Sequence, residues 1–352
     1  MKTTTAGAGI VRPLSTRWSS LARRPAFGSL LVTIAIFGFF ALNAGDSGFL
    51  TSSGTAGWLN TAAELGIVAV PIALLMISGE FDLSIGSVVG ASGILVAIST
   101  SQFGVPFEIS IVMALILGLV TGLANGVLVI RTGMPSFIVT LATSFILLGI
   151  ALGMSRLIAS TSTVSLRVEG PTRELLAGKM GDFNASILWW VAISVLAIWV
   201  LARTPFGSWI YATGGNLDAA RRAGVPTSRV KLILFCTTGV AASLLGVITA
   251  AQVNSGNAVS GQGFVFQAPI VAVIGGILLT GGYGSVIGVC FGAAIYGIVS
   301  IGLFYTGWNT DWAPTFIGAL LVLAVLGNNM IRRFALSEKR AVPTMPKVGG
   351  RA

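Results

Sequence analysis

The sequence has 352 residues, of which 54% are hydrophobic and 9% are charged, and its formal net charge is +10 at pH 7. Soluble globular domains usually carry about 25% charged residues, so this composition excludes a soluble fold and indicates a membrane protein. The net positive charge does not indicate nucleic-acid binding, because the basic residues lie in loops beside apolar runs, where membrane orientation accounts for them. The absence of histidine excludes a histidine general base and a histidine metal ligand.

The apolar residues form runs of about 20, the length that crosses a bilayer as a helix. We therefore predict an all-α polytopic membrane protein with about ten transmembrane helices. The predicted spans lie near 27–44, 58–77, 83–100, 108–130, 136–154, 187–202, 232–251, 266–281, 284–306 and 313–331. Two connections, near 80 and 282, are very short, so a re-entrant or broken helix there would leave eight full spans. The first run is interpreted as an uncleaved span rather than a signal peptide, because its basic lead-in is long.

Basic residues predict the orientation of these spans. With the N-terminus inside, the predicted inner segments contain 17 of the 21 Lys and Arg residues. The other four lie on the outer loop 155–186, beside three acidic residues. Cytoplasmic loops carry an excess of Lys and Arg, so both termini are expected in the cytoplasm. The expected organisation is a basic tail at 1–26, a transmembrane domain at 27–331 and a second basic tail at 332–352.

A polar turn at 78–84 carries two acidic residues next to the membrane. We expect Asp82 to cap a helix that begins at Leu83, where its carboxylate would meet free N–H groups and the positive end of the helix dipole. Glu80 has no such structural role, so it is the freer candidate for a contact with a partner. The capping role of Asp82 is compatible with a place at the same interface.

A short similarity relates the two halves of the chain. The segments 84–90 and 284–288 both open an apolar helix directly after a tight polar turn. Two weakly similar halves, at about 58–154 and 232–331, would fit the repeat architecture that is common in transporters.

Glycine is abundant, with 46 residues in the chain. Gly118, Gly122 and Gly126 follow one another at intervals of four, which places small residues on one face of a helix. Small residues let membrane helices approach closely, so this stripe predicts tight helix packing.

Five polar residues are candidates for a substrate path. An ionisable residue inside a span usually faces a cavity or a partner, which applies to Glu64 unless its span begins later and leaves it at the interface. The outer segment 252–267 is polar and uncharged, and its amides offer both donors and acceptors to a neutral, hydroxyl-rich ligand. Ordinary loop composition is the alternative interpretation of that segment. The candidates are Glu64, Gln252, Asn254, Asn257 and Gln267.

The stretch 214–231, GGNLDAARRAGVPTSRVK, is the most polar connection between two predicted spans. Asn216 is expected to cap one short helix that Gly224 ends, and Thr227 or Ser228 to cap a second. A capped, charged helical pair of this kind is either a solvated connector or a docking surface. The candidate contact residues are Asn216, Asp218, Arg221, Arg222, Gly224 and Arg229.

The sequence lacks the motifs of an enzyme or a nucleotidase. No G-x-x-x-x-G-K-[ST] phosphate loop occurs, because the sequence around Lys179 does not match it. No metal-binding or cofactor motif is found, and no nucleophile is paired with a base, so catalytic residues, metals and cofactors are not expected. Uphill transport would then depend on an ion gradient or on a separate ATPase.

Four ordered motifs resemble the permease subunits of monosaccharide (ribose-type) ATP-binding-cassette importers. The segment 79–87, GEFDLSIGS, is similar to the family's G-G-I-D-L-S-V-G-S turn, and 135–141, PSFIVTL, resembles its P-x-F-I-V-T-L element. The stretch 214–231 resembles its G-G-N…A-A-R…R-V-K loop, and 271–285 its V-I-G-G…G-G-x-G-S segment. The main departures are Glu80 and Phe81, where Gly and Ile are usual, and Leu217, Asp218 and Arg222 in the loop.

The resemblance implies a multi-pass protein of the bacterial inner membrane that imports a monosaccharide but has no enzymatic activity of its own. It implies three partners: a second permease copy, identical or closely related, a cytoplasmic ATP-binding subunit, and an extracytoplasmic sugar-binding protein that delivers the substrate. It also implies that 214–231 is the coupling loop that docks on the ATPase.

Three alternatives remain open from the sequence. Related permeases of this plan carry nucleosides, a signalling furanose or branched-chain amino acids. An ion-coupled secondary transporter is a rival from another class, since Glu64 and Glu108 are the acids within its spans. An intramembrane enzyme is the least favoured interpretation, because no catalytic set is visible.

Overall fold

A computed structural model of the chain describes residues 25–338, and the side chains of residues 26–326. The described part is almost entirely helical, as the sequence predicts. Its helices are α2 (Pro25–Ala44), α3 (Ser52–Ile77), α4 (Ile85–Phe103), α5 (Phe107–Thr132), α6 (Ser136–Ala159), α7 (Pro171–Ala177), α8 (Ser186–Arg203), α9 (Pro205–Gly215), α10 (Leu217–Arg222), α11 (Thr227–Gln252), α12 (Phe264–Ile274), α13 (Val286–Tyr305) and α14 (Ala313–Glu338). Its short strands are β1 (Thr163–Ser165), β2 (Lys179–Met180), β3 (Phe183–Asn184) and β4 (Ser255–Asn257).

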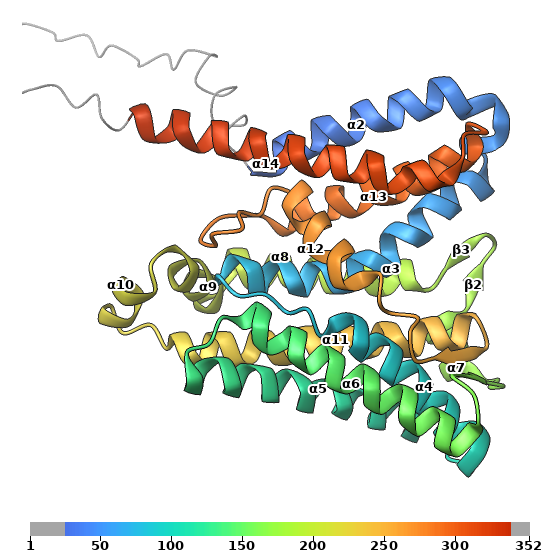
Figure 1. The fold of residues 1–352 in the computed structure, drawn as a ribbon. Helices are drawn as coiled ribbons and strands as arrows, with labels where there is room; N and C mark the ends of the chain where they lie inside the picture. The colour runs from blue at the N-terminus through green and yellow to red at the C-terminus, as the bar shows by residue number, and fades with distance from the viewer. Residues whose placement is uncertain (1–24, 339–352) are drawn as a thin grey trace, which may run out of the picture.

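The long helices run side by side, and most of the short elements lie at the two ends of the bundle, whereas the short helix α12 lies between them (Figure 1). One end carries α9 and α10, and we call it the α10 end. The other carries α7 with the hairpin of β2 and β3, and we call it the α7 end. The start of α2 and the end of α14 both lie toward the α10 end. The described part of the chain therefore begins and ends toward the same end of the bundle.

Helix α3 lies at the centre of the bundle. Every residue from Leu65 to Ile77 is buried, because α3 itself carries apolar side chains such as Ala, Val, Ile, Leu and Met on all of its faces. A helix that is apolar all round is a core element. By contrast, α5, α6 and α8 bury only one face and expose large apolar side chains on the other, as expected for helices that face lipid.

Eight of the described helices are long and apolar enough to cross a membrane. They confirm the predicted spans from 27–44 to 232–251 and the span at 284–306. Two predictions remain. The one at 313–331 corresponds to α14, but its described apolar part, Thr310–Leu326, is shorter than a candidate span. The one at 266–281 is wrong in its second half, because α12 ends at Ile274. Gly275 and Gly276 follow, and Gly276 has a φ of 93°, a conformation that favours glycine and ends the helix. The apolar segment 275–285 continues without helix.

The glycine stripe of α5 packs as predicted. A methyl group on Gly118 would lie 2.2 Å from the carbonyl oxygen of Gly239, and one on Gly122 would lie 2.2 Å from that of Phe235. Both of these carbonyls belong to α11, so the two backbones are in direct contact. Such an approach is possible only without side chains on that face.

At the α7 end, the segment after α11 turns back into the bundle. Strand β4 pairs antiparallel with β1, which lies in the long connection between α6 and α8. The chain then runs along a glycine face of α4: a methyl group on Gly90 would meet Ala258, and one on Gly86 would meet Gly261. Strand β4, the turns at 258–263 and the short helix α12 occupy this stretch, so the span expected at 266–281 is not one continuous helix.

Candidate functional site

Helix α10 is a short, well-capped helix at the α10 end. The Asn216 side-chain oxygen accepts from the backbone N–H of Ala219 at 2.9 Å, so the predicted cap is confirmed. Gly224 follows the helix with a φ of 81°, as expected for a residue that ends a helix. The predicted second cap is wrong. Pro226 occupies the N-cap of α11, and the Thr227 hydroxyl instead accepts from Arg221 Nε at 3.3 Å.

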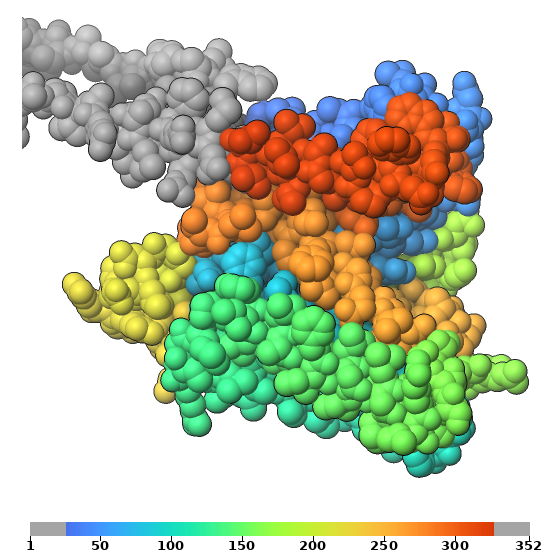
Figure 2. All heavy atoms as spheres, viewed as in Figure 1, coloured from blue at the N-terminus to red at the C-terminus, as the bar shows by residue number. Residues whose placement is uncertain are grey.

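The candidate contact residues of the loop all lie at the surface. Figure 2 shows α9 and α10 as a lobe that stands out from the bundle. The candidates are all exposed: Asn216, Asp218, Arg221, Arg222 and Gly224 lie in or beside α10, and Arg229 lies near the start of α11. Three of the six are arginines, so the surface is cationic and is accessible to a partner.

A junction of glycines attaches this lobe to the rest of the bundle. The backbone N–H of Gly282 donates to the carbonyl of Ile77, the last residue of α3, at 2.8 Å. A methyl group on Gly214 would lie 1.9 Å from that same carbonyl oxygen, and one on Gly281 would lie 2.9 Å from the Cα of Gly79. Three sequence motifs far apart in the chain therefore meet here backbone to backbone.

Tyr211 adds a side-chain bond to the glycine junction. Its hydroxyl donates to the carbonyl of Gly284 at 2.8 Å. Burial is the main cause that raises the pKa of Tyr211, and charge repulsion from the neighbouring Tyr283 adds to it. The phenol therefore keeps its proton and remains a donor. This bond ties α9 to the segment that precedes α13.

The segment 78–84 is a linker between α3 and α4: Ser78 and Gly79 form a turn at the end of α3, and residues 80–84 continue without helix (Figure 1). Its backbone N–H groups find partners on α6: Phe81 donates to the Ser136 hydroxyl at 2.9 Å, and Leu83 to the Thr140 hydroxyl at 3.0 Å. Non-helical backbone at membrane depth requires such partners. The hydroxyls of α6 therefore make this linker possible.

Asp82 lies fully buried at the far end of the linker. Its carboxylate accepts from the backbone N–H of Ser84 at 2.9 Å and from the hydroxyls of Ser84 and Thr238, each at 2.6 Å. Helix α4 begins at Ile85, two residues later than expected. The Asp82 carboxylate thus binds the residue before the helix, not the first turn. Asn125 of α5 completes the cluster by donating to the Ser84 hydroxyl at 2.9 Å.

Glu80 forms an ion pair with Lys231 in the first part of α11. The two side chains are only 11% and 15% exposed. Glu80 therefore touches another helix of the same chain, next to the exposed lobe. The pairing was missed from the sequence because 151 residues separate the partners.

The five candidates for a substrate path lie mainly toward the α7 end. Glu64 lies about 18 Å along α3 from Ser52 at 1.5 Å per residue, which places it inside the span rather than at its interface. Gln252 ends α11, and its amide nitrogen is buried without a hydrogen-bond partner. Asn254 accepts from Arg173 at 3.4 Å. Among the described residues, no hydrogen bond joins any two of the five, which also include Asn257 and Gln267.

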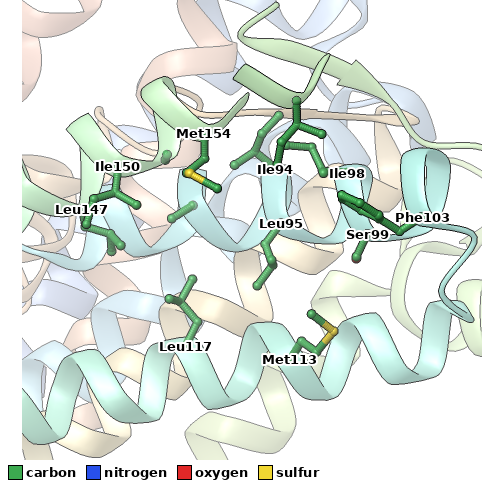
Figure 3. Close-up of a pocket in the computed structure, with 13 residues that line it drawn as sticks. Ile94, Leu95, Ile98, Ser99, Phe103, Met113, Leu117, Leu147, Ile150 and Met154 are labelled. Atoms are coloured by element: carbon green, nitrogen blue, oxygen red, sulfur yellow. The ribbon is translucent and has the colours of Figure 1, made fainter. Parts of the chain in front are cut away.

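A separate groove of about 250 Å³ lies between α4, α5 and α6. Figure 3 shows its walls of aliphatic, Met and Phe side chains, with Ser99 as the polar exception. The Ser99 hydroxyl is already bound to Ser110. This lining offers no donors for a hydroxyl-rich ligand, so the groove is excluded as a sugar site. The described residues also contain no group of His, Cys, Asp and Glu that could hold a metal.

Comparisons with known proteins identify relatives over most of the chain. Residues 54–325 match the family model described as "Branched-chain amino acid transport system / permease component". The fructose import permease protein FrcC of Rhizobium meliloti is 31% identical, with 79% of this chain and 78% of that protein covered.

Two further relatives have similar identity. The xylose transport system permease protein XylH of Escherichia coli K12 is 31% identical, over 87% of this chain and 92% of that protein. The autoinducer 2 import system permease protein LsrC of Photorhabdus laumondii is 32% identical, over 85% and 87%. No solved structure matches the chain.

Proposed function

The chain belongs to the branched-chain amino acid transport system / permease component family, and we propose that it carries a monosaccharide through the membrane as the permease subunit of an ATP-driven importer. The observation that carries this proposal is the agreement of relatives that cover most of the chain: two are named for the sugars fructose and xylose and one for autoinducer 2. Members of this family are transport subunits, so the chain is a transporter component rather than an enzyme.

The substrate class rests on these relatives and on the outer segment of the chain. The polar, uncharged segment 252–267 contains amides that suit hydroxyl groups. Gln252 supports a role in the path, because a buried amide nitrogen without a partner is costly unless a ligand or water binds it. Glu64 and the remaining amides at Asn254, Asn257 and Gln267 are proposed to border the same path.

The energy source is proposed to be a separate cytoplasmic ATPase that docks on α10. Permeases of this kind work with an ATPase and with a binding protein on the other side of the membrane. The exposed, cationic surface of α10 supports docking there, and the glycine junction offers a firm connection from that surface to α3. Asp218, Arg221 and Arg222 would provide contacts, while Asn216 and Gly224 set the ends of the helix.

The proposed orientation places the α10 end in the cytoplasm. The basic residues of 203–231 support this orientation. The protein is then a multi-pass inner-membrane protein whose tails, 1–26 and 332–352, flank the transmembrane permease domain 27–331 in the cytoplasm. A second permease copy is proposed to complete the pathway, and the α7 end would face the binding protein.

Transport by purified components tests the proposal. The chain is reconstituted in vesicles with its ATPase, and labelled fructose, xylose, ribose and leucine are offered together with the loaded binding protein. ATP-dependent uptake of a sugar, abolished by an inactive ATPase, is the expected result. Uptake of leucine alone would overturn the substrate class. Uptake that an ion gradient drives without any ATPase would overturn the proposed energy source.

A further inference from the structure

The linker 78–84 is held on two sides by helices from different parts of the chain. The backbone N–H groups of Phe81 and Leu83 donate to two hydroxyls of α6, which we call the hydroxyl row: those of Ser136 and Thr140. The side chains of Glu80 and Asp82 bind α11. Two residues of extended chain cover about 6.6 Å, and four residues of helix cover about 6 Å. The spacing between the Phe81 and Leu83 N–H groups is therefore nearly the same as the spacing between the two hydroxyls of α6.

A path of side-chain contacts joins α10 to this linker. Arg221 of α10 donates to Thr227, the first residue of α11. Lys231, one turn later on α11, pairs with Glu80. These contacts connect α10 and the first turn of α11 to the linker through an ion pair.

The other end of the linker lies deep in the bundle. Asp82 binds Thr238, which lies about 16 Å along α11 from Thr227 at 1.5 Å per residue. Ser84, the next polar residue, directly precedes α4. The linker therefore extends from the α10 end to the level at which α4 begins.

Burial of the ion pair indicates a role other than stability. The desolvation of two charges offsets most of their attraction, so apolar replacements of similar size are often at least as stable. An ion pair nevertheless fixes the relative position of its partners through both distance and direction. Lys231 and Glu80 fix the start of α11 against the linker in this way.

We propose that the Lys231–Glu80 pair and the linker 78–84 transmit the movement of α10 to the start of α4 in the interior of the membrane. The proposal rests on the proposed function, because it requires an ATPase that moves α10. In this scheme the pair is a positioning device: it contacts neither the ATPase nor the substrate. The ion pair couples the movement of the ATPase to the substrate path.

The test removes both charges and keeps the volume of the side chains, with the double variant Glu80→Gln, Lys231→Met in the complete transporter. We expect assembly with the ATPase and basal ATP hydrolysis to remain within about two-fold of wild type. Stimulation of hydrolysis by the loaded binding protein, and substrate uptake per ATP hydrolysed, should both fall about ten-fold. The charge-swapped variant Glu80→Lys, Lys231→Glu should recover at least half of the coupling.

Uptake per ATP at the wild-type level in the neutral double variant would overturn the proposal. Loss of coupling in proportion to lost assembly, in both the neutral and the swapped variants, would likewise overturn it in favour of a purely structural pair. A wild-type complex without ATP-dependent uptake would instead contradict the proposed function. The two failures are therefore distinguishable.

A second experiment restrains the linker without altering the pair. Phe81→Cys and Ser136→Cys are introduced after Cys236→Ala and Cys290→Ala, and the new thiols are joined by a short thiosulfonate cross-linker that a reductant cleaves. The cross-linked transporter should assemble with the ATPase but lose uptake, and the reductant should restore at least half of it. Full uptake in completely cross-linked protein would contradict a linker that moves.

Discussion

The glycine junction makes a quantitative prediction for the variant Gly214→Ala. The added methyl carbon would lie 1.9 Å from the carbonyl oxygen of Ile77 and 2.7 Å from the backbone nitrogen of Gly282. Both atoms are backbone and are already joined by a 2.8 Å hydrogen bond. Overpacking of this kind costs about 1–3 kcal/mol, and the lost bond costs about 1 kcal/mol. We therefore expect a destabilisation of about 2–4 kcal/mol.

Gly215→Ala is the matched control, because no atom lies within 4 Å of the methyl group that it would add. The assay is thermal unfolding of both variants in the same detergent. At roughly 2–4 °C per kcal/mol, Gly214→Ala should unfold at least about 4 °C below wild type and Gly215→Ala within about 1 °C of it. Equal unfolding temperatures for the two variants would refute the direct backbone contact at Gly214.

Three further predictions concern α10, the linker and the glycine junction. Replacing Arg221 and Arg222 by Glu should reduce copurification of the ATPase about ten-fold or more and leave membrane insertion unchanged; unchanged copurification would contradict docking on α10. Thr238→Val removes a donor to the buried carboxylate of the linker and should cost about 1.5–3 kcal/mol, whereas Thr237→Val on the exposed face of α11 should leave the thermal midpoint unchanged. Similar midpoints would argue against a hydrogen bond from Thr238 to the Asp82 carboxyl group. Tyr211→Phe leaves a backbone carbonyl without its donor and should cost about 1 kcal/mol in the same thermal assay; a midpoint equal to that of wild type would show that the carbonyl finds another donor.

The sequence was sufficient for features whose partners lie close by in the chain. Asn216 and Gly224 act within one turn of helix, so the cap and the end of α10 were predictable. The glycine stripe of α5 was predictable for a similar reason, because its period alone puts the residues on one face. Apolar length likewise predicted the eight described helices that are long and apolar enough to cross a membrane.

Hydropathy failed at α12 because burial does not require a helix. Ile277 is fully buried, yet it follows the glycine pair that ends α12 and packs within an irregular segment. An apolar residue inside a bundle gives the same signal in either state. Only the glycines at Gly275 and Gly276 marked the end, and glycine is common in membrane helices.

The linker was misjudged because its partners are remote. The segment was expected to be a tight turn with Asp82 as a helix cap, but its backbone is satisfied by Ser136 and Thr140 of α6. Those hydroxyls lie on one helix face at an interval of four, a pattern that indicates a polar contact without naming the partner. The prediction that Thr227 caps α11 failed for a related reason, because its hydroxyl accepts a hydrogen bond from Arg221 instead.

The remote partners of the linker also constrain how the chain enters the membrane during synthesis. The backbone donors of Phe81 and Leu83 precede their acceptors by 55 and 57 residues, which is several seconds of translation at about 5–20 residues per second. Thr238, the partner of the Asp82 carboxyl group, is synthesised later still, because it follows Asp82 by 156 residues. Released into lipid alone, this segment would expose unpaired polar groups. Helices α3 and α4 must therefore be retained at the site of insertion until α6, and then α11, emerge to receive them.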